Sequence, residues 1–366
     1  MRDIDMNGSD PVATSPVGIM HQMWALAGQS DADFLRDTVE DVQLADELGF
    51  HSIWLAEHHY VRPDSFYSRL PDPEILIARL IPETSRIRLA TGIKILVLDD
   101  PSRTIERLRL LDLLSGHRVL LGVGQGSPDE LAVTGVAPEE RRAGFRARLI
   151  DLAALLTSGT GAGGRNLTPD ADLRPLETMW VGVRDVESIA LTASLGMNFI
   201  VGEAEVGRRQ SALVQAFRDA GGTGEARGAR LVCVAETDEE AMAAASAPGR
   251  VLYDRFRQGV YHADAVRLGL LPETEAADDA EAFRRLEYIV GSPATVVDGL
   301  SEYIEATGVD ALNVLVHTPG MERRAARRSL TLLREEVVDL LVPALDRNAA
   351  PKGARAPLAS PVGTRT

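Results

Sequence analysis

Glu57, His58 and His59 are the residues of this sequence whose types and spacing most directly suggest chemistry. They follow the short apolar segment 52–56, which predicts a buried strand, so they lie just past its carboxyl end. Parallel α/β folds carry their reactive groups at that end of the sheet. Two adjacent imidazoles and a carboxylate are costly to bury without a partner or a ligand. We therefore predict that these residues form the core of an active site.

Two further histidines also follow predicted strands. His21 follows the first predicted strand and His317 follows the last. In a closed barrel the first, second and last strands are neighbours, so we expect four imidazoles to face one cavity. The other three histidines lack this placement and are interpreted as structural: His51, His117 and His262.

Converging histidines could also bind zinc in a metal-dependent hydrolase. The side chains of His58 and His59 diverge because the residues are adjacent, so both rarely bind one ion. No His, Lys or Cys follows the fifth or sixth predicted strand to complete a two-metal site. Asp99 and Asp100 are better explained as the start of a helix. We predict no metal and keep the hydrolase as a less favoured alternative.

Eight short apolar segments, each followed by a helical pattern, predict the fold. This alternation is typical of a parallel sheet, and eight units of it predict an α/β fold of the closed (β/α)8 type, a TIM barrel. A doubly wound sheet is the alternative, although it normally has about five to seven strands. The predicted strands are 17–20, 52–56, 87–92, 119–122, 179–183, 198–201, 229–234 and 310–316.

The chain is expected to form one domain over residues 16–347, with insertions after the fourth and seventh strands. Residues 1–15 and 348–366 are predicted to be disordered tails. The segment 249–290, in the insertion after the seventh strand, is a candidate lid over the active site.

Composition excludes several classes of protein. The 366 residues include 54 acidic and 39 basic side chains, so the formal net charge is -15 and a general nucleic-acid or anionic-membrane surface is not expected. Cys233 is the only cysteine, which rules out an internal disulfide and suits a reducing compartment. Neither a signal peptide nor a membrane span is predicted. We expect a cytoplasmic protein that acts on a small molecule.

Two segments offer backbone amides to an anion. The glycine-rich run 122–126 follows the fourth strand but departs from the dinucleotide-binding pattern. Arg184, Asp185 and Ser188 lie at a strand-to-helix turn that suits an anion, or equally an ordinary helix capped by Asp185. Barrels often bind phosphate after the last strands, which would involve Gly291 and Ser292 instead.

Four ordered motifs resemble those of the bacterial luciferase-like monooxygenases. They are Ala56-Glu-His-His-Tyr60, the run 86–92 (Arg-Ile-Arg-Leu-Ala-Thr-Gly), Pro101-x-Arg-x-x-Glu106 followed by 111–118 (Leu-Asp-Leu-Leu-Ser-Gly-His-Arg), and Gly122-Val-Gly-Gln-Gly126. The likeness extends over most of residues 17–345. It implies a TIM barrel that binds FMN at its carboxyl-terminal face. A separate flavin reductase would supply reduced FMN, which reacts with O2 to a flavin hydroperoxide and oxygenates an organic substrate.

The resemblance also implies roles for individual residues. His58 matches the family's catalytic histidine and His59 its neighbour, with Glu57 beside them. Thr91, Gly92 and Ile93 lie at the flavin, and the bond between Gly92 and Ile93 matches an unusual cis peptide of the family. Gln125 stands where many members have an arginine that binds the FMN phosphate, so Arg184 is expected to restore the charge, with Asp185 and Ser188 at the remaining phosphate positions. Asp100 replaces a histidine of the luciferases proper, so light emission is not implied.

The substrate is expected to be small and largely apolar or planar, because Phe66 and Tyr67 lie in the loop after the second strand and would form its wall, with His21 and His317 in the same pocket. Two alternatives remain open. One is a deazaflavin-dependent oxidoreductase on the same barrel, and the other is a noncatalytic flavin-binding relative that acts as a partner subunit. Members of the family commonly pair, so a homodimer is expected.

Overall fold

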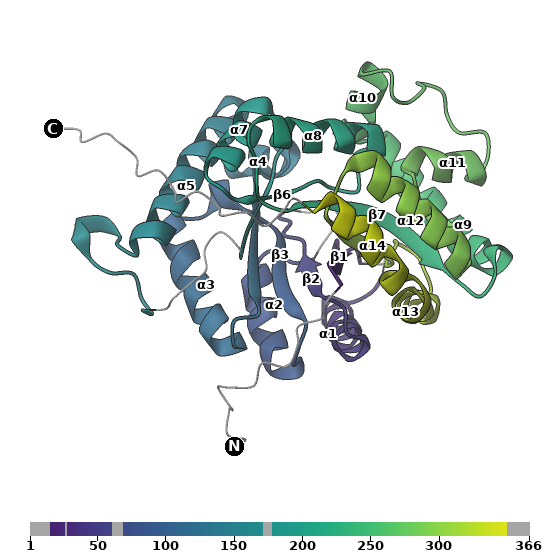
Figure 1. Ribbon diagram of the computed structural model, residues 1–366, viewed down its shortest axis with the longest axis horizontal. Coiled ribbons are helices and arrows are strands. Elements are labelled where there is room, and N and C mark those ends of the chain that lie inside the picture. Colours follow the sequence, from purple (N-terminus) through teal and green to yellow (C-terminus); the bar gives the residue numbers. More distant parts are fainter. Residues whose placement is uncertain (1–14, 26–27, 61–68, 171–177, 350–366) are drawn as a thin grey trace.

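A closed barrel of eight parallel strands forms the centre of the molecule. The computed structural model describes residues 15–25, 28–60, 69–170 and 178–349 (Figure 1). The barrel runs in the order β6-β5-β4-β3-β2-β1-β9-β7 and is closed by pairing of β6 with β7. Its strands are β1 (Val17–His21), β2 (Ser52–Leu55), β3 (Arg88–Ile95), β4 (Val119–Gly124), β5 (Met179–Gly182), β6 (Asn198–Ile200), β7 (Ala226–Val234) and β9 (Ala311–Leu315). The predicted TIM barrel is therefore confirmed.

A ninth strand lies outside the barrel. β8 (Ile289–Gly291) pairs with the last residues of β7, beyond the part of β7 that contacts β9. β7 itself begins at Ala226, three residues before the predicted start. β8 is only three residues long, and Ile289 and Val290 are partly exposed. Its sequence therefore lacks the buried apolar segment from which a strand is predicted.

Helices surround the barrel, and polar side chains and glycines cap their ends. In α1, the hydroxyl of Ser30 accepts the backbone N–H of Asp33 at 3.1 Å, and Gly49 ends the helix with a φ of 81°. Asp100 and Asp185 cap the helices that follow them. The helices of the first half are α1 (Asp31–Leu48), α2 (Pro73–Leu80), α3 (Pro101–Ser115), α4 (Pro128–Thr134), α5 (Pro138–Ser158), α7 (Val186–Ser194) and α8 (Gly207–Asp219), with short turns at Ile81–Glu83, Leu96–Leu98 and Ala162–Gly164.

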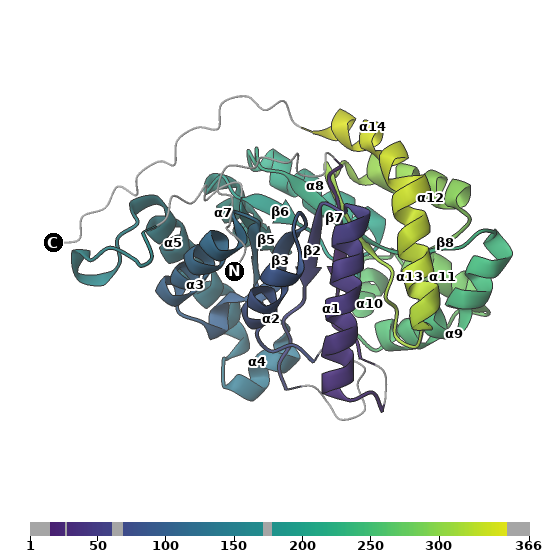
Figure 2. The ribbon, with the colours of Figure 1, turned by 90° about the horizontal axis from the view of Figure 1, so that it is seen from below.

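The insertion after β7 is itself helical. Figure 1 shows its helices gathered on one side of the barrel. The segment 249–290 does not begin a new element, because α9 continues through Gly249, which packs closely against Phe283 of α11. The helices of the second half are α9 (Asp238–Arg257), α10 (Val260–Arg267), α11 (Asp279–Leu286), α12 (Pro293–Thr307), α13 (Arg323–Leu332) and α14 (Val338–Asn348), with a π-helical turn at Leu333–Val337 between the last two. Figure 2 shows α13 lying beside α1.

Strand alternation divides the core into two layers. Met20, Trp54 and Leu120 point into the barrel, whereas Ile19 and Val17 pack outward against helices. The amino-terminal end of the interior is filled by Arg227, whose guanidinium lies 5.4 Å and 4.9 Å from two tryptophan rings. The packed interior leaves no room for a ligand, and TIM barrels bind their ligands at the carboxyl-terminal mouth. Among the described residues, no helix is long and apolar enough to cross a bilayer.

Candidate active site

A cavity of about 470 Å³ lies at the carboxyl-terminal mouth of the barrel. Loops after β1, β2, β4 and β6 form one part of its wall, and α9, α10 and α11 form the other. Its volume is within the range of about 300–1,000 Å³ found for pockets that hold drug-sized ligands. The side chains that line it include Trp24, His58, His59, Tyr60, Ser127, Glu130, Glu203, Glu205, Leu231, Leu252, Arg255, Phe256, Tyr261, Arg285 and Leu286.

His58 is oriented by a carboxylate from a different loop. Its Nδ1 lies 2.9 Å from Oε1 of Glu130, in the first turn of α4. Burial alone would raise the pKa of Glu130, but bonds from His58, from the Ser127 hydroxyl and from the His59 backbone outweigh it and lower that pKa. An ionised carboxylate only accepts hydrogen bonds, so Nδ1 of His58 carries the proton and, in the neutral ring, Nε2 is the proton acceptor.

His59 has a carboxylate partner of its own. Its Nε2 lies 3.0 Å from Oε1 of Glu57, whose side chain is only 3% exposed. The hydrogen bond with Glu57 raises the pKa of His59 above its ordinary value, against burial, with further contributions from the charges of Glu57 and Glu130. The two adjacent histidines therefore form separate pairs with carboxylates on different elements.

Glu57 also belongs to a buried network of charged side chains. Nζ of Lys94 lies 3.9 Å from Oε2 of Glu57, 2.7 Å from Oε1 of Glu74 and 3.1 Å from Oδ2 of Asp99. Arg107 of α3 also contacts Asp99, at 2.6 Å. Burial lowers the pKa of Lys94, but Glu74 and Glu57 outweigh it, so that pKa is raised and the ammonium stays charged. We refer to Glu57, Glu74, Lys94, Asp99 and Arg107 as the Lys94 network.

The expectation that four imidazoles face one cavity is wrong for His21 and His317, which are not among the residues lining this cavity. The rings of His21 and His317 lie 4.9 Å apart, and Nε2 of His317 is 3.3 Å from Asp41 of α1. Strand alternation places His21 on the same outward face as Ile19, toward Phe34 of α1. Burial, followed by the neighbouring His317, lowers the pKa of His21 to about 3, so it stays neutral.

The three residues of β3 expected at the flavin are placed in the barrel wall. Thr91 is buried, and its hydroxyl both donates to the carbonyl and accepts from the N–H of Gly122. The Gly92–Ile93 peptide bond is cis, as the resemblance implies. A Cβ on Gly92 would lie 2.7 Å from Cβ of Trp54, so only glycine fits there. Ile93 is half-buried and packs with the interior residues of the barrel.

Gln125, Asp185 and Ser188 come together at the start of α7. The amide of Gln125 donates to Oδ2 of Asp185 at 2.7 Å and to the hydroxyl of Ser188 at 3.2 Å. Asp185 also accepts the N–H of Ser188 at 3.0 Å, as a helix cap does. Of the two interpretations of this turn, the capped helix is the one observed. A carboxylate already occupies the amino terminus of α7, which disfavours an anion there.

Arg184 points away from that turn. Its Nε lies 2.8 Å from Glu205, and its guanidinium lies 3.7 Å from the ring centre of Tyr261. Glu205 and Tyr261 both line the cavity, so Arg184 supports the cavity wall. Burial lowers the pKa of Arg184. The charge of Glu205 opposes this shift, and the charge of the nearby Arg141 adds to it. The backbone N–H of Ser292, offered as another phosphate position, instead donates to Asp238 at 2.6 Å.

Two residues of the site were missed by the sequence reasoning. Glu130 has a signal in the sequence, because Ser127-x-x-Glu130 is a capping-box pattern directly after a predicted strand. Glu203 follows β6 and carries no such signal. The predicted substrate residues Phe66 and Tyr67 lie outside the described residues. In the described part of the chain, no group of three or more His, Cys, Asp or Glu side chains is arranged to hold a metal ion.

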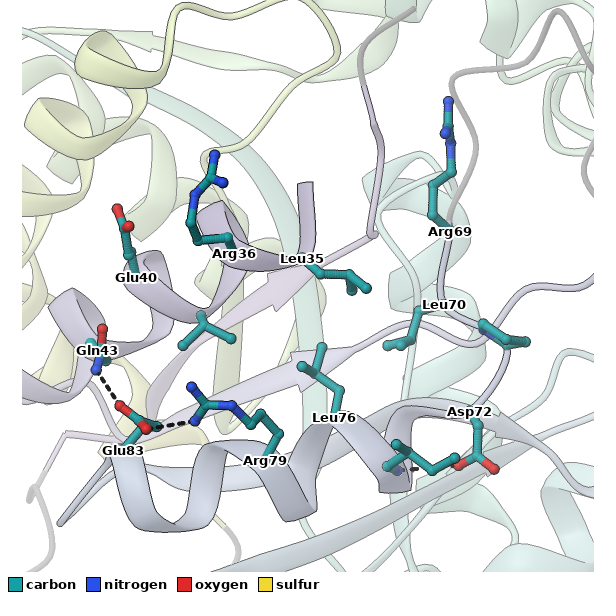
Figure 3. A pocket seen from close by; sticks show the side chains of 13 residues that line it. Leu35, Arg36, Glu40, Gln43, Arg69, Leu70, Asp72, Leu76, Arg79 and Glu83 are labelled. Carbon is teal, nitrogen blue, oxygen red and sulfur yellow. Dashed lines mark hydrogen bonds and ion pairs between the residues drawn. The ribbon is translucent and has the colours of Figure 1, made fainter. Parts of the chain in front are cut away.

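A larger cavity, of about 600 Å³, lies on the outside of the barrel between α1 and α2 (Figure 3). Leu35, Leu70 and Leu76 point toward one another across it. At its edge Glu83 accepts hydrogen bonds from Gln43 and Arg79, at 2.8 Å and 2.6 Å. This cavity contains no histidine, so the mouth of the barrel is the better candidate for chemistry.

Comparisons with known proteins agree with this geometry. The model of the luciferase-like monooxygenase family matches residues 17–311. The chain is 25% identical to the oxygenase component of the flavin-dependent trigonelline monooxygenase of Acinetobacter baylyi over 338 residues, 85% of this chain and 91% of that protein. It is 30% identical to the N-acetyl-S-alkylcysteine monooxygenase of Bacillus subtilis over 240 residues, 62% of this chain and 69% of the relative.

Solved structures show the same likeness. The crystal structure of apo-MsnO8 superposes with a TM-score of 0.70 and 27% identity, covering 88% of this chain and 98% of that one. The family match spans most of the barrel, and both named relatives are monooxygenases. The chain therefore belongs to the family of luciferase-like monooxygenases.

Proposed function

We propose that this chain is the oxygenase component of a two-component system that uses reduced FMN and O2 to oxygenate a small, largely apolar or planar organic substrate. The observation that carries the proposal is the pairing of His58 with Glu130 at the wall of a cavity whose remaining surface is mainly apolar. A histidine held by a carboxylate can move protons, and an apolar enclosure keeps water from reactive species.

The cavity has the features that a flavin requires. Its volume and its apolar and aromatic side chains suit a planar ring system. Reduced FMN, when bound, would supply the electrons that activate O2 and allow one oxygen atom to reach the substrate. A separate flavin reductase would provide the reduced cofactor, in line with the relative named as an oxygenase component.

The residues of the site would have different roles, in proton transfer or in the exclusion of water. Nε2 of His58 would accept or return a proton inside the cavity, while Glu130 keeps the ring in one tautomer. His59, whose pKa is raised mainly by Glu57, would hold a second proton beside it. Side chains of α9 and α10, such as Phe256 and Tyr261, would exclude water from the opposite wall, which is the lid role expected of this insertion.

We assign the FMN phosphate to Arg184 rather than to the amino terminus of α7. Gln125, Asp185 and Ser188 satisfy one another there, whereas Arg184 lies directly behind the cavity wall and Arg141 adds a second positive charge nearby. Arginine is well suited to phosphate because its guanidinium donates two parallel hydrogen bonds. Thr91, Gly92 and Ile93 would act from the barrel wall, by shaping the floor of the cavity.

The experiment that tests the assignment compares FMN with riboflavin, which lacks the phosphate. Anaerobic titration of the Arg184→Ala variant with each reduced flavin should show FMN affinity reduced by about tenfold or more and riboflavin affinity unchanged. The matched control is Arg209→Ala, because Arg209 is another arginine whose charge acts on Arg184. An equal loss for both flavins would move the phosphate elsewhere.

Oxygen chemistry is tested separately. When O2 is added, the complex with reduced FMN should consume O2 and its flavin spectrum should change. The His58→Ala variant should alter the rate of this reaction by about a hundredfold. Binding of reduced flavin without any oxygen reaction would instead favour the noncatalytic subunit. Binding of a reduced deazaflavin in preference to FMN would favour the deazaflavin-dependent oxidoreductase. A homodimer and a cytoplasmic location stay predictions from the sequence, and light scattering tests the first.

A further inference from the structure

Glu203 is an acidic side chain of the cavity wall to which the proposed oxygen chemistry gives no role. It follows β6, lines the cavity and is positioned by Gln22, whose amide donates to its Oε1 at 2.8 Å. Its own backbone carbonyl accepts from Nη1 of Arg230 at 3.3 Å. These two bonds come from the loop after β1 and from β7, so they fix both the side chain and the backbone of Glu203.

The other cavity carboxylates already have ionic partners. Glu130 is paired with His58 at 2.9 Å, and Glu205 is paired with Arg184 at 2.8 Å. Within the described ranges, no cationic side chain lies within ion-pair distance of the carboxylate of Glu203. Burial raises the pKa of Glu203, although Gln22, Arg230 and His58 act in the opposite direction. Among the described side chains, the carboxylate of Glu203 therefore has no direct counterion.

A partly buried carboxylate of this kind favours a ligand that brings a positive charge. An ammonium group would replace the missing counterion and form a charge-assisted hydrogen bond, whereas a neutral hydroxyl would form only the weaker bond. Two arginines, Arg255 and Arg285, also line the cavity. Arg285 is already bonded to Glu281 and to the hydroxyl of Tyr253. The remaining wall is mainly apolar, which suits the rest of such a ligand.

We propose that Glu203 is the substrate-recognition residue of this cavity and that the substrate is an amine, a protonated nitrogen attached to an apolar body. This inference rests on the proposed function, because it takes the cavity at the barrel mouth to be the site where the substrate is oxygenated. His58, which lies close enough for its charge to affect Glu203, would then be near the bound amine.

The test uses two probes of the same shape, benzylamine and benzyl alcohol, with the full chain. Calorimetry or ligand-observed NMR should show the amine binding about tenfold more tightly than the alcohol. In Glu203→Gln, which keeps the shape and removes the charge, this preference should fall to about one. In the matched control Glu205→Gln, which removes a cavity carboxylate that already has a partner, the preference should persist.

A preference for the amine that survives in Glu203→Gln would overturn the proposal, as would equal binding of the two probes, or no binding of the amine, by the unmodified chain. If Glu203→Gln does not fold, the pH dependence of the unmodified chain replaces it. The amine affinity should rise as the pH rises through the pKa of Glu203, while the alcohol affinity should not. The charged groups facing Glu203 are His58 from the loop after β2 and Arg230 from β7.

Flavin titrations separate this inference from the proposed function. If reduced FMN binds but the amine preference is absent, the inference about Glu203 fails and the proposed function stands. If the amine preference depends on Glu203 but neither reduced flavin binds, recognition of an amine stands and the oxygenase proposal fails.

Discussion

Nδ1 of His58 lies 2.9 Å from Oε1 of Glu130, although the two residues are 72 positions apart in the chain. The same oxygen accepts the backbone N–H of His59 at 3.0 Å, so one carboxylate fixes both the ring and the loop that carries it. Glu130 is itself held by Ser127 through the capping box of α4. The orientation of the histidine therefore depends on how α4 begins.

Replacing Glu130 by glutamine should impair proton transfer by His58. A glutamine amide can donate to Nδ1 and so allow the other tautomer, in which Nε2 carries the proton. We expect the proton-dependent rate of reduced FMN reoxidation by O2, measured by stopped flow, to change by about a hundredfold. The double variant Glu130→Gln/His58→Asn should show no further change beyond His58→Asn alone. Additive effects would mean that Glu130 acts independently of His58.

His59 should titrate above the ordinary histidine value of 6.5, because Glu57 raises its pKa. A histidine whose pKa is higher in the folded than in the unfolded protein stabilises the fold. This contribution is fully present at pH values below the pKa of the unfolded state, and it is lost as the pH rises through the pKa of the folded state. We therefore expect His59 to contribute less to the free energy of unfolding at pH 8 than at pH 6. NMR titration of the His59 ring, assigned with His59→Gln, measures the pKa.

Glu57→Gln provides the control for that titration. Removing the carboxylate should bring the pKa of His59 down toward or below 6.5, since only the charge of Glu130 then opposes the effect of burial. An unchanged pKa in this variant would show that Glu57 is not the cause of the shift.

Lys94→Met should strongly destabilise the protein. The Lys94 side chain is 6% exposed and contacts three carboxylates, so its removal leaves buried negative charge without compensation. We expect a loss of about 3–5 kcal/mol in the free energy of unfolding, measured with urea. The double variant Lys94→Met/Glu74→Gln removes one charge of each sign and should recover part of that loss. Arg107→Met, which removes a more exposed cation of the Lys94 network, should cost about 1 kcal/mol or less.

Gly122→Ala should destabilise the barrel by overpacking. A Cβ at this position would overlap the backbone carbonyl oxygen of Thr91 and lie 3.0 Å from Cγ2 of Ile93. Backbone cannot move aside as a flexible side chain can, so we expect a loss of about 1–3 kcal/mol in urea unfolding. Gly202→Ala is the matched control, because nothing lies within 4 Å of its added Cβ. Equal stability of the two variants would contradict this account.

The order of apolar and polar residues along the chain is enough to predict the barrel and the end of it at which His58 and His59 lie. Eight apolar segments with helices between them, and caps such as Ser30 and Asp185, specify the elements through short-range chemistry that a linear pattern records. His58 and His59 could be placed at the mouth because they directly follow a strand. The motifs around them also identified the family.

The directions of several side chains become known only from the folded barrel. The first strand is apolar on both faces, as strands of a buried parallel sheet are, so its pattern does not say that His21 faces α1 rather than the barrel mouth. The resemblance places Arg184 with Asp185 and Ser188 around a phosphate. In the structure Asp185 and Ser188 bond to each other, and the partner of Arg184 is Glu205 from the next loop. Glu130 reaches His58, and Lys94 of β3 reaches Glu57, only because the pairing of neighbouring strands brings residues that are distant in sequence together. Such contacts depend on strand register and loop path, which no local pattern contains.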